Sequence, residues 1–213
     1  IVQNCACPSV ALAAAPALCN NSGTLNLSTI QVTTQPGSWA LTTIPPGATS
    51  PATFTPATGI FNATGAIPGN YQVTYTLTTP PPAGCPTSAS QTITVVAAPN
   101  AGTGGTTTVC NTQTTPVVLS DLLTGASGGG TWTLTGGTAN PGAFNPATGQ
   151  FNPNGHPPAT LTFTYTLTGT TPCPNATTTV TVTVTAAPNA GTSGTLDVCN
   201  TTTVPILLSD IIT

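Results

Sequence analysis

Two stretches decide the fold class: Leu161-Thr-Phe-Thr-Tyr-Thr-Leu167 and, shortly after it, Val180-Thr-Val-Thr-Val-Thr185. In both of them an apolar side chain alternates with a threonine. A period of two is typical of a β-strand with one face buried and the other exposed. Residues 170–175 between them contain two prolines and an asparagine, which predicts a hairpin loop.

The preceding residues continue the same pattern. Trp132 and Leu134 begin another alternating strand, and Phe144 and Phe151 bracket the stretch Pro146-Ala-Thr-Gly149. Proline presets φ and glycine accepts a positive φ, so this stretch predicts a tight turn. Only residues 119–123 are compatible with a single helical turn. The chain is therefore predicted to be all-β.

The chain also repeats itself. Ala97-Ala-Pro-Asn-Ala-Gly-Thr103 recurs 89 residues later at 186–192, and Cys110-Asn-Thr112 recurs at 199–201. A more divergent copy lies upstream, around Trp39. The repeat divides the chain into the tail of a preceding repeat (1–13), two full units (14–98, the first unit, and 99–187, the second unit) and the start of a further repeat (188–213). We expect a slice of a longer tandem protein or, alternatively, an open-ended subunit that its neighbours complete.

Each unit has about 89 residues, one Trp, two Cys and roughly seven short strands. This pattern predicts tandem immunoglobulin-like β-sandwich repeats that are stabilised by disulfides. Tyr165 lies eight residues before Cys173, so that cysteine falls in a hairpin loop and the core disulfide of antibody domains is not expected. The predicted core residues are Trp39, Trp132, Phe144, Phe151, Phe163 and Tyr165.

Seven cysteines without paired C-x-x-C motifs indicate disulfides and an oxidising compartment. Two pairings are possible. Pairing within units gives Cys19–Cys85 and Cys110–Cys173 and leaves Cys5, Cys7 and Cys199 unassigned. Pairing across linkers gives Cys7–Cys19, Cys85–Cys110 and Cys173–Cys199 and leaves Cys5. We favour the first, because the loop cysteine and the early cysteine would then meet at one end of the unit, but the second stays open.

Charge excludes several functions. The chain has no Lys or Arg, three acidic residues and a formal charge of −3, with a mean hydropathy of +0.23. Without cationic side chains it cannot neutralise nucleic-acid phosphates or bind an anionic membrane surface. No stretch is apolar for long enough to span a bilayer. We therefore expect no nucleic-acid partner and no membrane insertion by this segment.

Few residues could take part in catalysis or metal binding. Asp121 and Asp210 occupy the same repeat position, and a turn or cap is the expected role, because calcium needs six to eight oxygen ligands. His156 is the only histidine, and we expect it on a surface loop. A single histidine without a carboxylate pair supports neither a nucleophilic triad nor a glycosidase. We expect no enzyme activity, no metal and no cofactor.

Four short sequence motifs point to a known family: Phe144-Asn-Pro-Ala-Thr-Gly-x-Phe151, Gly130-Thr-Trp132, Pro172-Cys-Pro174 and Ala-Pro-Asn-Ala-Gly. They resemble the tandem repeats of giant secreted surface proteins of Bacteroidetes, including adhesins linked to gliding. The resemblance implies an immunoglobulin-like repeat exported to the bacterial cell surface within a long filamentous protein. It transfers no catalytic residue. The near absence of charge departs from the family.

Together these observations predict a structural segment of an extracellular stalk or filament that acts as a stiff, adhesin-type spacer. Its partners would be further copies of the repeat in cis and other chains of a filament. One alternative is a self-assembling fibre subunit with strand exchange or edge contacts between chains. Another is a glycan-binding module, which would need an exposed aromatic pair such as Trp39 with Tyr71.

Overall fold

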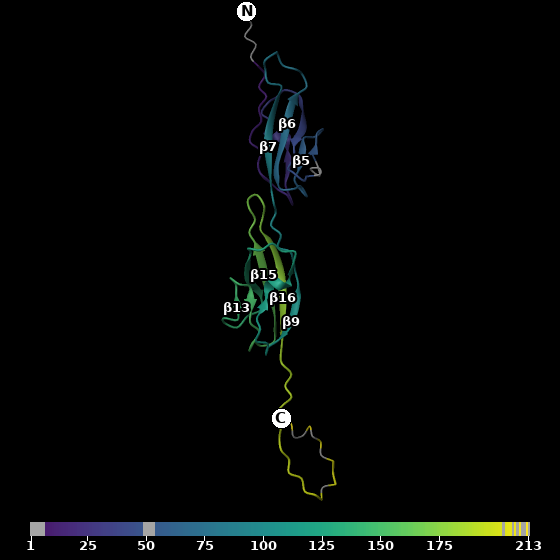
Figure 1. The fold of residues 1–213 in the computed structure, drawn as a ribbon, viewed down its shortest axis with the longest axis vertical. Helices are drawn as coiled ribbons and strands as arrows, with labels where there is room; N and C mark the ends of the chain where they lie inside the picture. Colours follow the sequence, from purple (N-terminus) through teal and green to yellow (C-terminus); the bar gives the residue numbers. More distant parts are fainter. Residues whose placement is uncertain are drawn as a thin grey trace, which may run out of the picture.

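The structure, a computed structural model, describes residues 7–48, 54–201, 203–205, 207, 209 and 212. Figure 1 shows two β-rich bodies in line along the long axis, the first unit followed by the second. Every regular element in the described residues is a strand or a single 3-10 turn. The prediction of an all-β chain is therefore confirmed.

The first unit contains β1 (Leu18–Cys19), β2 (Thr24–Asn26), the 3-10 turn η1 (Leu27–Ile30), β3 (Gly37–Thr43), β4 (Phe54–Thr55), β5 (Ile60–Asn62), β6 (Gly69–Leu77) and β7 (Ser88–Val96). The second unit contains β8 (Thr103–Gly104), β9 (Thr106–Cys110), β10 (Val117–Val118), η2 (Leu119–Leu122), β11 (Leu123–Thr124), β12 (Thr131–Gly136), β13 (Phe144–Asn145), β14 (Gln150–Phe151), β15 (Ala159–Leu167) and β16 (Ala176–Thr185).

The main sheets of the two units have matching strand orders. The first unit has a four-stranded sheet in the order β1-β7-β6-β3, and the second has β9-β16-β15-β12. In each, the long central pair is antiparallel, and the short edge strand β1 or β9 runs parallel to β7 or β16. Each unit also has a three-stranded sheet, β2-β5-β4 or β10-β14-β13, and β8 pairs with β11.

Apolar residues and threonines alternate along β15 and β16, so they lie on opposite faces of the main sheet. Phe163 lies opposite Val180 in the β15–β16 pair, and both are fully buried. On the other face threonines oppose threonines, and their hydroxyls bond across strands, as between the Oγ1 atoms of Thr135 and Thr164 at 2.8 Å. Neutral cross-strand pairs thus occupy positions that charged residues often fill on other sheets.

Each unit has its own core, and the cores share no residue. In the second unit the Phe163 ring lies 4.9 Å from that of Phe144 and 5.6 Å from that of Phe151, which joins the four-stranded sheet to the three-stranded one. The fold is therefore sandwich-like. Of the six predicted core residues, five are buried and Phe144 is half-buried.

Packing explains the glycine in the Gly130-Thr-Trp132 motif. The Gly130 N–H donates to the Tyr165 hydroxyl at 2.8 Å, and this hydroxyl donates to the Ser127 carbonyl at 2.7 Å. A Cβ on Gly130 would overlap the Tyr165 ring. Trp132 packs on the same ring, with centroids 5.0 Å apart. Glycine is required because the tyrosine ring lies directly over the backbone.

We predict that Gly130→Ala lowers the stability of the second unit by about 1–3 kcal/mol, the usual cost of overpacking a core. Gly128→Ala is the matched control, because a Cβ there meets nothing within 4 Å. Urea denaturation of both variants measures the difference. Equal stability of the two variants would contradict the proposed packing role of Gly130.

One element differs from expectation. A second 3-10 turn, η1, was not predicted, and the Asn26 side chain caps it by accepting from the Ser28 N–H. Residues 7–13 pack on the first unit, where the Ala13 N–H donates to the Ile30 carbonyl at 2.7 Å. The helical turn predicted at residues 119–123 is present as η2.

Described residues after the second unit make few contacts with it. Val198 is 56% exposed, whereas its counterpart in the second unit, Val109, is 8% exposed. Leu196, Val204, Leu207 and Ile212 are exposed as well. This segment therefore presents apolar side chains of the kind that the second unit buries.

Candidate functional site: the disulfide-linked junction

A disulfide joins the two units. Cys173, in the hairpin loop between β15 and β16, is bonded to Cys19 of the first unit, with Cα atoms 5.0 Å apart. Figure 1 shows this loop extending from β15 toward the first unit. Both cysteines are buried, with 3% of Cys19 and 6% of Cys173 exposed. The link is therefore shielded from solvent and from dissolved thiols.

The loop is shaped from within to present its cysteine. The Cys173 N–H donates to the Thr170 carbonyl at 2.8 Å, and the Gly169 N–H donates to Asn175 Oδ1 at 3.0 Å. A Cβ on Gly169 would overlap the backbone of Cys173 and Pro174. These contacts hold the loop in the conformation that presents Cys173 to the first unit.

Cys19 receives the loop where the chain leaves the first unit. It is the last residue of β1 and pairs in parallel with Val96, the last residue of β7. The Sγ of Cys173 lies 3.5 Å from the Val96 carbonyl oxygen; since a bonded sulfur carries no hydrogen, this is a packing contact. The disulfide and the point where the chain leaves the first unit are therefore at the same corner of that unit, formed by Cys19 and Val96.

The linker is held at both ends. The Ala98 N–H donates to Asn20 Oδ1 at 2.8 Å, which fixes the linker to the first unit. Asn100 donates through Nδ2 to the Gly125 carbonyl at 3.0 Å, and its own carbonyl accepts from the Ser127 N–H at 2.8 Å. Pro99 alone separates these anchors, and its ring restricts φ.

The second disulfide links Cys7 to Cys85, with Cα atoms 5.4 Å apart. Cys85 lies in the hairpin loop between β6 and β7, at the position that Cys173 has in the second unit. In both cases the loop cysteine bonds a cysteine that lies earlier in the chain than the main sheet of the unit to which the loop belongs. The two disulfides fit a protein that matures in an oxidising compartment.

Both predicted pairings are wrong for the cysteines described. Because β9 runs parallel to β16, Cys110 at the end of β9 lies beside Thr185, whereas Cys173 precedes Ala176 at the start of β16. The length of β16 separates the two cysteines by about 30 Å, so they cannot bond within the unit. The across-linker pairing fails because Cys173 turns back to the preceding unit.

Two cysteines in the described part of the chain are free. Cys199 is exposed, and Cys110 is half-buried. The Sγ of Cys110 lies 3.2 Å from the Thr112 hydroxyl. Hydrogen bonds from the Thr112 hydroxyl and from its backbone lower the pKa of the Cys110 thiol below its ordinary value. Cys5 lies outside the described residues.

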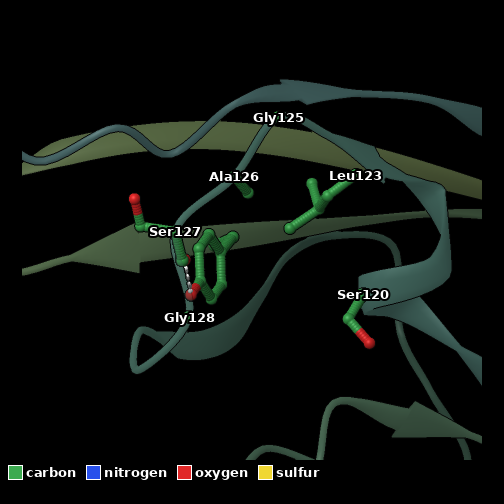
Figure 2. A pocket seen from close by; sticks show the side chains of 7 residues that line it. Ser120, Leu123, Gly125, Ala126, Ser127 and Gly128 are labelled. Carbon is green, nitrogen blue, oxygen red and sulfur yellow. Dashed lines mark hydrogen bonds between the residues drawn. The ribbon is translucent and has the colours of Figure 1, made fainter.

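Two shallow pockets lie on the units. One of about 300 Å³ is at the junction, between residues 17–24 and Pro172. Another of about 180 Å³ is lined by Leu123, Ala126 and Ser127 (Figure 2), and there the Tyr165 hydroxyl is already bonded to Ser127. The described lining residues of both offer hydroxyl and backbone groups but no His, Asp or free Cys.

The acidic residues do not form a metal site in the part of the chain described. Asp121 is exposed in η2, and Asp210 lies outside the described residues. No group of three or more His, Cys, Asp or Glu side chains able to hold a metal ion occurs among the residues that the structure describes.

His156 corrects the sequence prediction, because it is buried and only 1% exposed. Its Nδ1 lies 2.6 Å from the Pro157 carbonyl, which can only accept, so Nδ1 carries the proton. The ring packs edge-on against Phe151 with centroids 5.5 Å apart, and Nε2 has no hydrogen-bond partner. It fills the place of the buried Ala66 in the first unit, so its role is packing.

The aromatic side chains do not form a surface platform. All ten are buried or half-buried, including Trp39 at 8% and Tyr71 at 0% exposure. The pair named as a requirement for a glycan-binding module is therefore inside the first core.

No protein-family model matches the chain, and no curated protein matches it. Across the described residues, no helix is long and apolar enough to cross a membrane.

Proposed function

We propose that the chain is a non-enzymatic structural segment of a long extracellular stalk or filament on a bacterial surface, in which immunoglobulin-like repeats of about 89 residues act as stiff spacers. The observation that carries this proposal is the junction. The covalent bond between Cys19 and Cys173 joins two separate cores, which a stalk under tension or bending requires and a freely jointed chain of domains lacks.

Stiffness follows from the number of restraints at one corner. The disulfide fixes the hairpin loop, the Asn20–Ala98 hydrogen bond fixes the start of the linker, and Asn100 fixes its end. Relative domain motion is the default between units joined by a single flexible linker. A disulfide beside a held linker gives two attachment points, which restrict relative motion of the units more than a single linker does.

The surface chemistry supports an exposed, durable location. The chain has no Lys or Arg and so has no cleavage site for proteases that require them. Its few charges make the surface insensitive to salt and to pH over most of the range. These properties, with the disulfides, support an extracellular stalk of the type found in giant secreted surface proteins.

A self-assembling fibre is the second candidate, and a specific observation favours it. The edge strands β3 and β12 of the main sheets carry no charged side chain. Proteins usually protect such edges with charges, because a free edge can pair with another chain. Lateral contact between chains through β3 or β12 would give a thicker filament.

Electron microscopy of material from its native source distinguishes the two functions. A stalk predicts a thread one domain wide with an axial period of about 35–40 Å per unit, the length of a ten-residue strand plus its linker. A helical fibre with several chains in cross-section would support the second candidate. Isolated particles without an axial repeat would contradict both.

A further inference from the structure

Cys110 occupies in the second unit the place that Cys19 occupies in the first. Cys19 ends β1 opposite Val96, and Cys110 ends β9 opposite Thr185. The next residue is asparagine in both units, and its N–H donates to the carbonyl of that partner residue, at 3.0 Å in the first unit and 2.9 Å in the second. The backbone around the two cysteines is therefore built in the same way.

The chain that leaves each corner is held by the same contacts. Two hydrogen bonds recur in each unit with nearly equal lengths: Ala98 N–H to Asn20 Oδ1 (2.8 Å) and Ala187 N–H to Asn111 Oδ1 (2.9 Å), then Gly102 N–H to Asn100 Oδ1 (2.9 Å) and Gly191 N–H to Asn189 Oδ1 (2.9 Å). The segment after the second unit therefore departs like the linker that carries the second unit away from the first.

The two corners differ in one respect: the sulfur of Cys19 is bonded, whereas that of Cys110 is a free thiol. Cys110 is half-buried at its corner. The hydrogen bonds from Thr112 that lower the pKa of this thiol increase the fraction of thiolate near neutral pH. Thiolate is the form that attacks a disulfide.

We propose that Cys110 is the attachment point for the hairpin-loop cysteine of another unit of the same kind, in the way that Cys19 receives Cys173. The proposal rests on the stalk function and adds the partner at each corner. The occupant is a short, uncharged loop with a cysteine next to proline, as in Cys85-Pro86 and Cys173-Pro174. Because the corner carries no charge either, no like-charge repulsion opposes its approach.

Bond formation needs an oxidant, for which a small-molecule disulfide such as oxidised glutathione suffices. The Cys110 thiolate attacks the disulfide, forms a mixed disulfide and releases one thiolate. The incoming loop thiolate then attacks Sγ of Cys110 and releases the second thiolate. Two cysteine thiols lose two electrons and two protons, and one disulfide of the oxidant becomes two thiols.

The test uses the full chain with one loop cysteine released. Cys5→Ser/Cys7→Ser/Cys199→Ser leaves Cys19–Cys173 intact and leaves Cys85 and Cys110 as the two thiols. In a glutathione redox buffer this variant should form head-to-tail disulfide polymers. Peptide mapping should find Cys85–Cys110 in at least about tenfold excess over Cys85–Cys85, because docking at the corner raises the effective concentration of the correct partner.

The matched control adds Cys110→Ser, which should abolish the polymers. The proposal would be overturned if the triple variant stayed monomeric while retaining its Cys19–Cys173 link and native fluorescence. It would also be overturned if its crosslinks joined Cys85 and Cys110 at random.

A second measurement needs no variant, so it stands even if the triple variant fails to fold. Non-reducing peptide mapping of native material should show Cys110 bonded to a loop peptide containing Cys-Pro. A peptide of this chain, with Cys85 or Cys173, identifies a second copy, and a different loop sequence identifies a following unit of the same chain. A free Cys110 thiol overturns the proposal but leaves the stalk function intact if the axial repeat is observed by microscopy.

Discussion

Cys19→Ser/Cys173→Ser should release the two units from each other and lower the free energy of unfolding of the chain by about 5 kcal/mol. The bond spans 154 residues, and cross-linking so long a loop reduces the entropy of the unfolded chain by about that amount. In the folded state, the linker contacts of Asn20 and Asn100 remain but the covalent bond between the units is lost. Urea denaturation measures the first effect, and small-angle X-ray scattering measures the second as a broader distribution of distances.

Cys7→Ser/Cys85→Ser is the control for this prediction. It also removes a disulfide that closes a long loop, with a sequence separation of 78 residues, and should cost about 4–5 kcal/mol by the same argument. Its scattering profile should keep the inter-unit distances of the wild type. If both double variants, or neither, broadened the inter-unit distances, the Cys19–Cys173 bond would not be what stiffens the junction.

Phe163→Ala should destabilise the second unit by about 3–5 kcal/mol, the usual cost of removing a buried phenylalanine. Phe163 is fully buried and its ring contacts those of Phe144 and Phe151, so the substitution leaves a cavity between the two sheets. Thr160→Ala, at an exposed position of the same strand, is the matched control and should change stability by less than about 0.5 kcal/mol.

Each unit carries one tryptophan reporter, Trp39 in the first core and Trp132 in the second, so single-tryptophan variants (Trp39→Phe or Trp132→Phe) follow the urea denaturation of one unit at a time. We expect Phe163→Ala to shift the transition of Trp132 and to leave that of Trp39 in place. A single transition that shifts as a whole would contradict the description of two separate cores.

The sequence predicts the strands well because their causes are local. Alternation of Thr with Leu, Phe, Tyr and Val specifies β15 and β16, and the turn before Gln150 follows from Pro146 and Gly149. The six aromatic residues expected in the cores follow from the same periodicity. The burial of His156 was not predicted, because its neighbours Gly155 and Pro157 are typical of an exposed turn. The cause of its burial is the contact of its ring with Phe151, which the local sequence does not reveal.

The disulfides were not predictable because they depend on non-local pairing. β1 is only two residues long, and its parallel pairing with β7 places Cys19 at the exit of the unit. An antiparallel pairing would have placed it at the opposite end, near the hairpin loop, where the within-unit prediction assumed it to be. The direction of one short edge strand therefore decides whether the cysteines stabilise each unit alone or join it to its neighbour.

Non-reducing peptide mapping of the intact chain shows directly whether a disulfide joins the two units. The chain has no Lys or Arg, so elastase, which cleaves after small aliphatic residues, replaces trypsin. Val10 and Ala13 lie between Cys7 and Cys19, and Val95 and Ala97 lie between Cys85 and Cys110, so cleavage there separates the relevant cysteines. We expect one peptide pair that contains Cys19 and Cys173 and a second that contains Cys7 and Cys85. Recovery of Cys19–Cys85 together with Cys110–Cys173 would contradict it, since each unit would then be closed on itself and the junction would be only a linker.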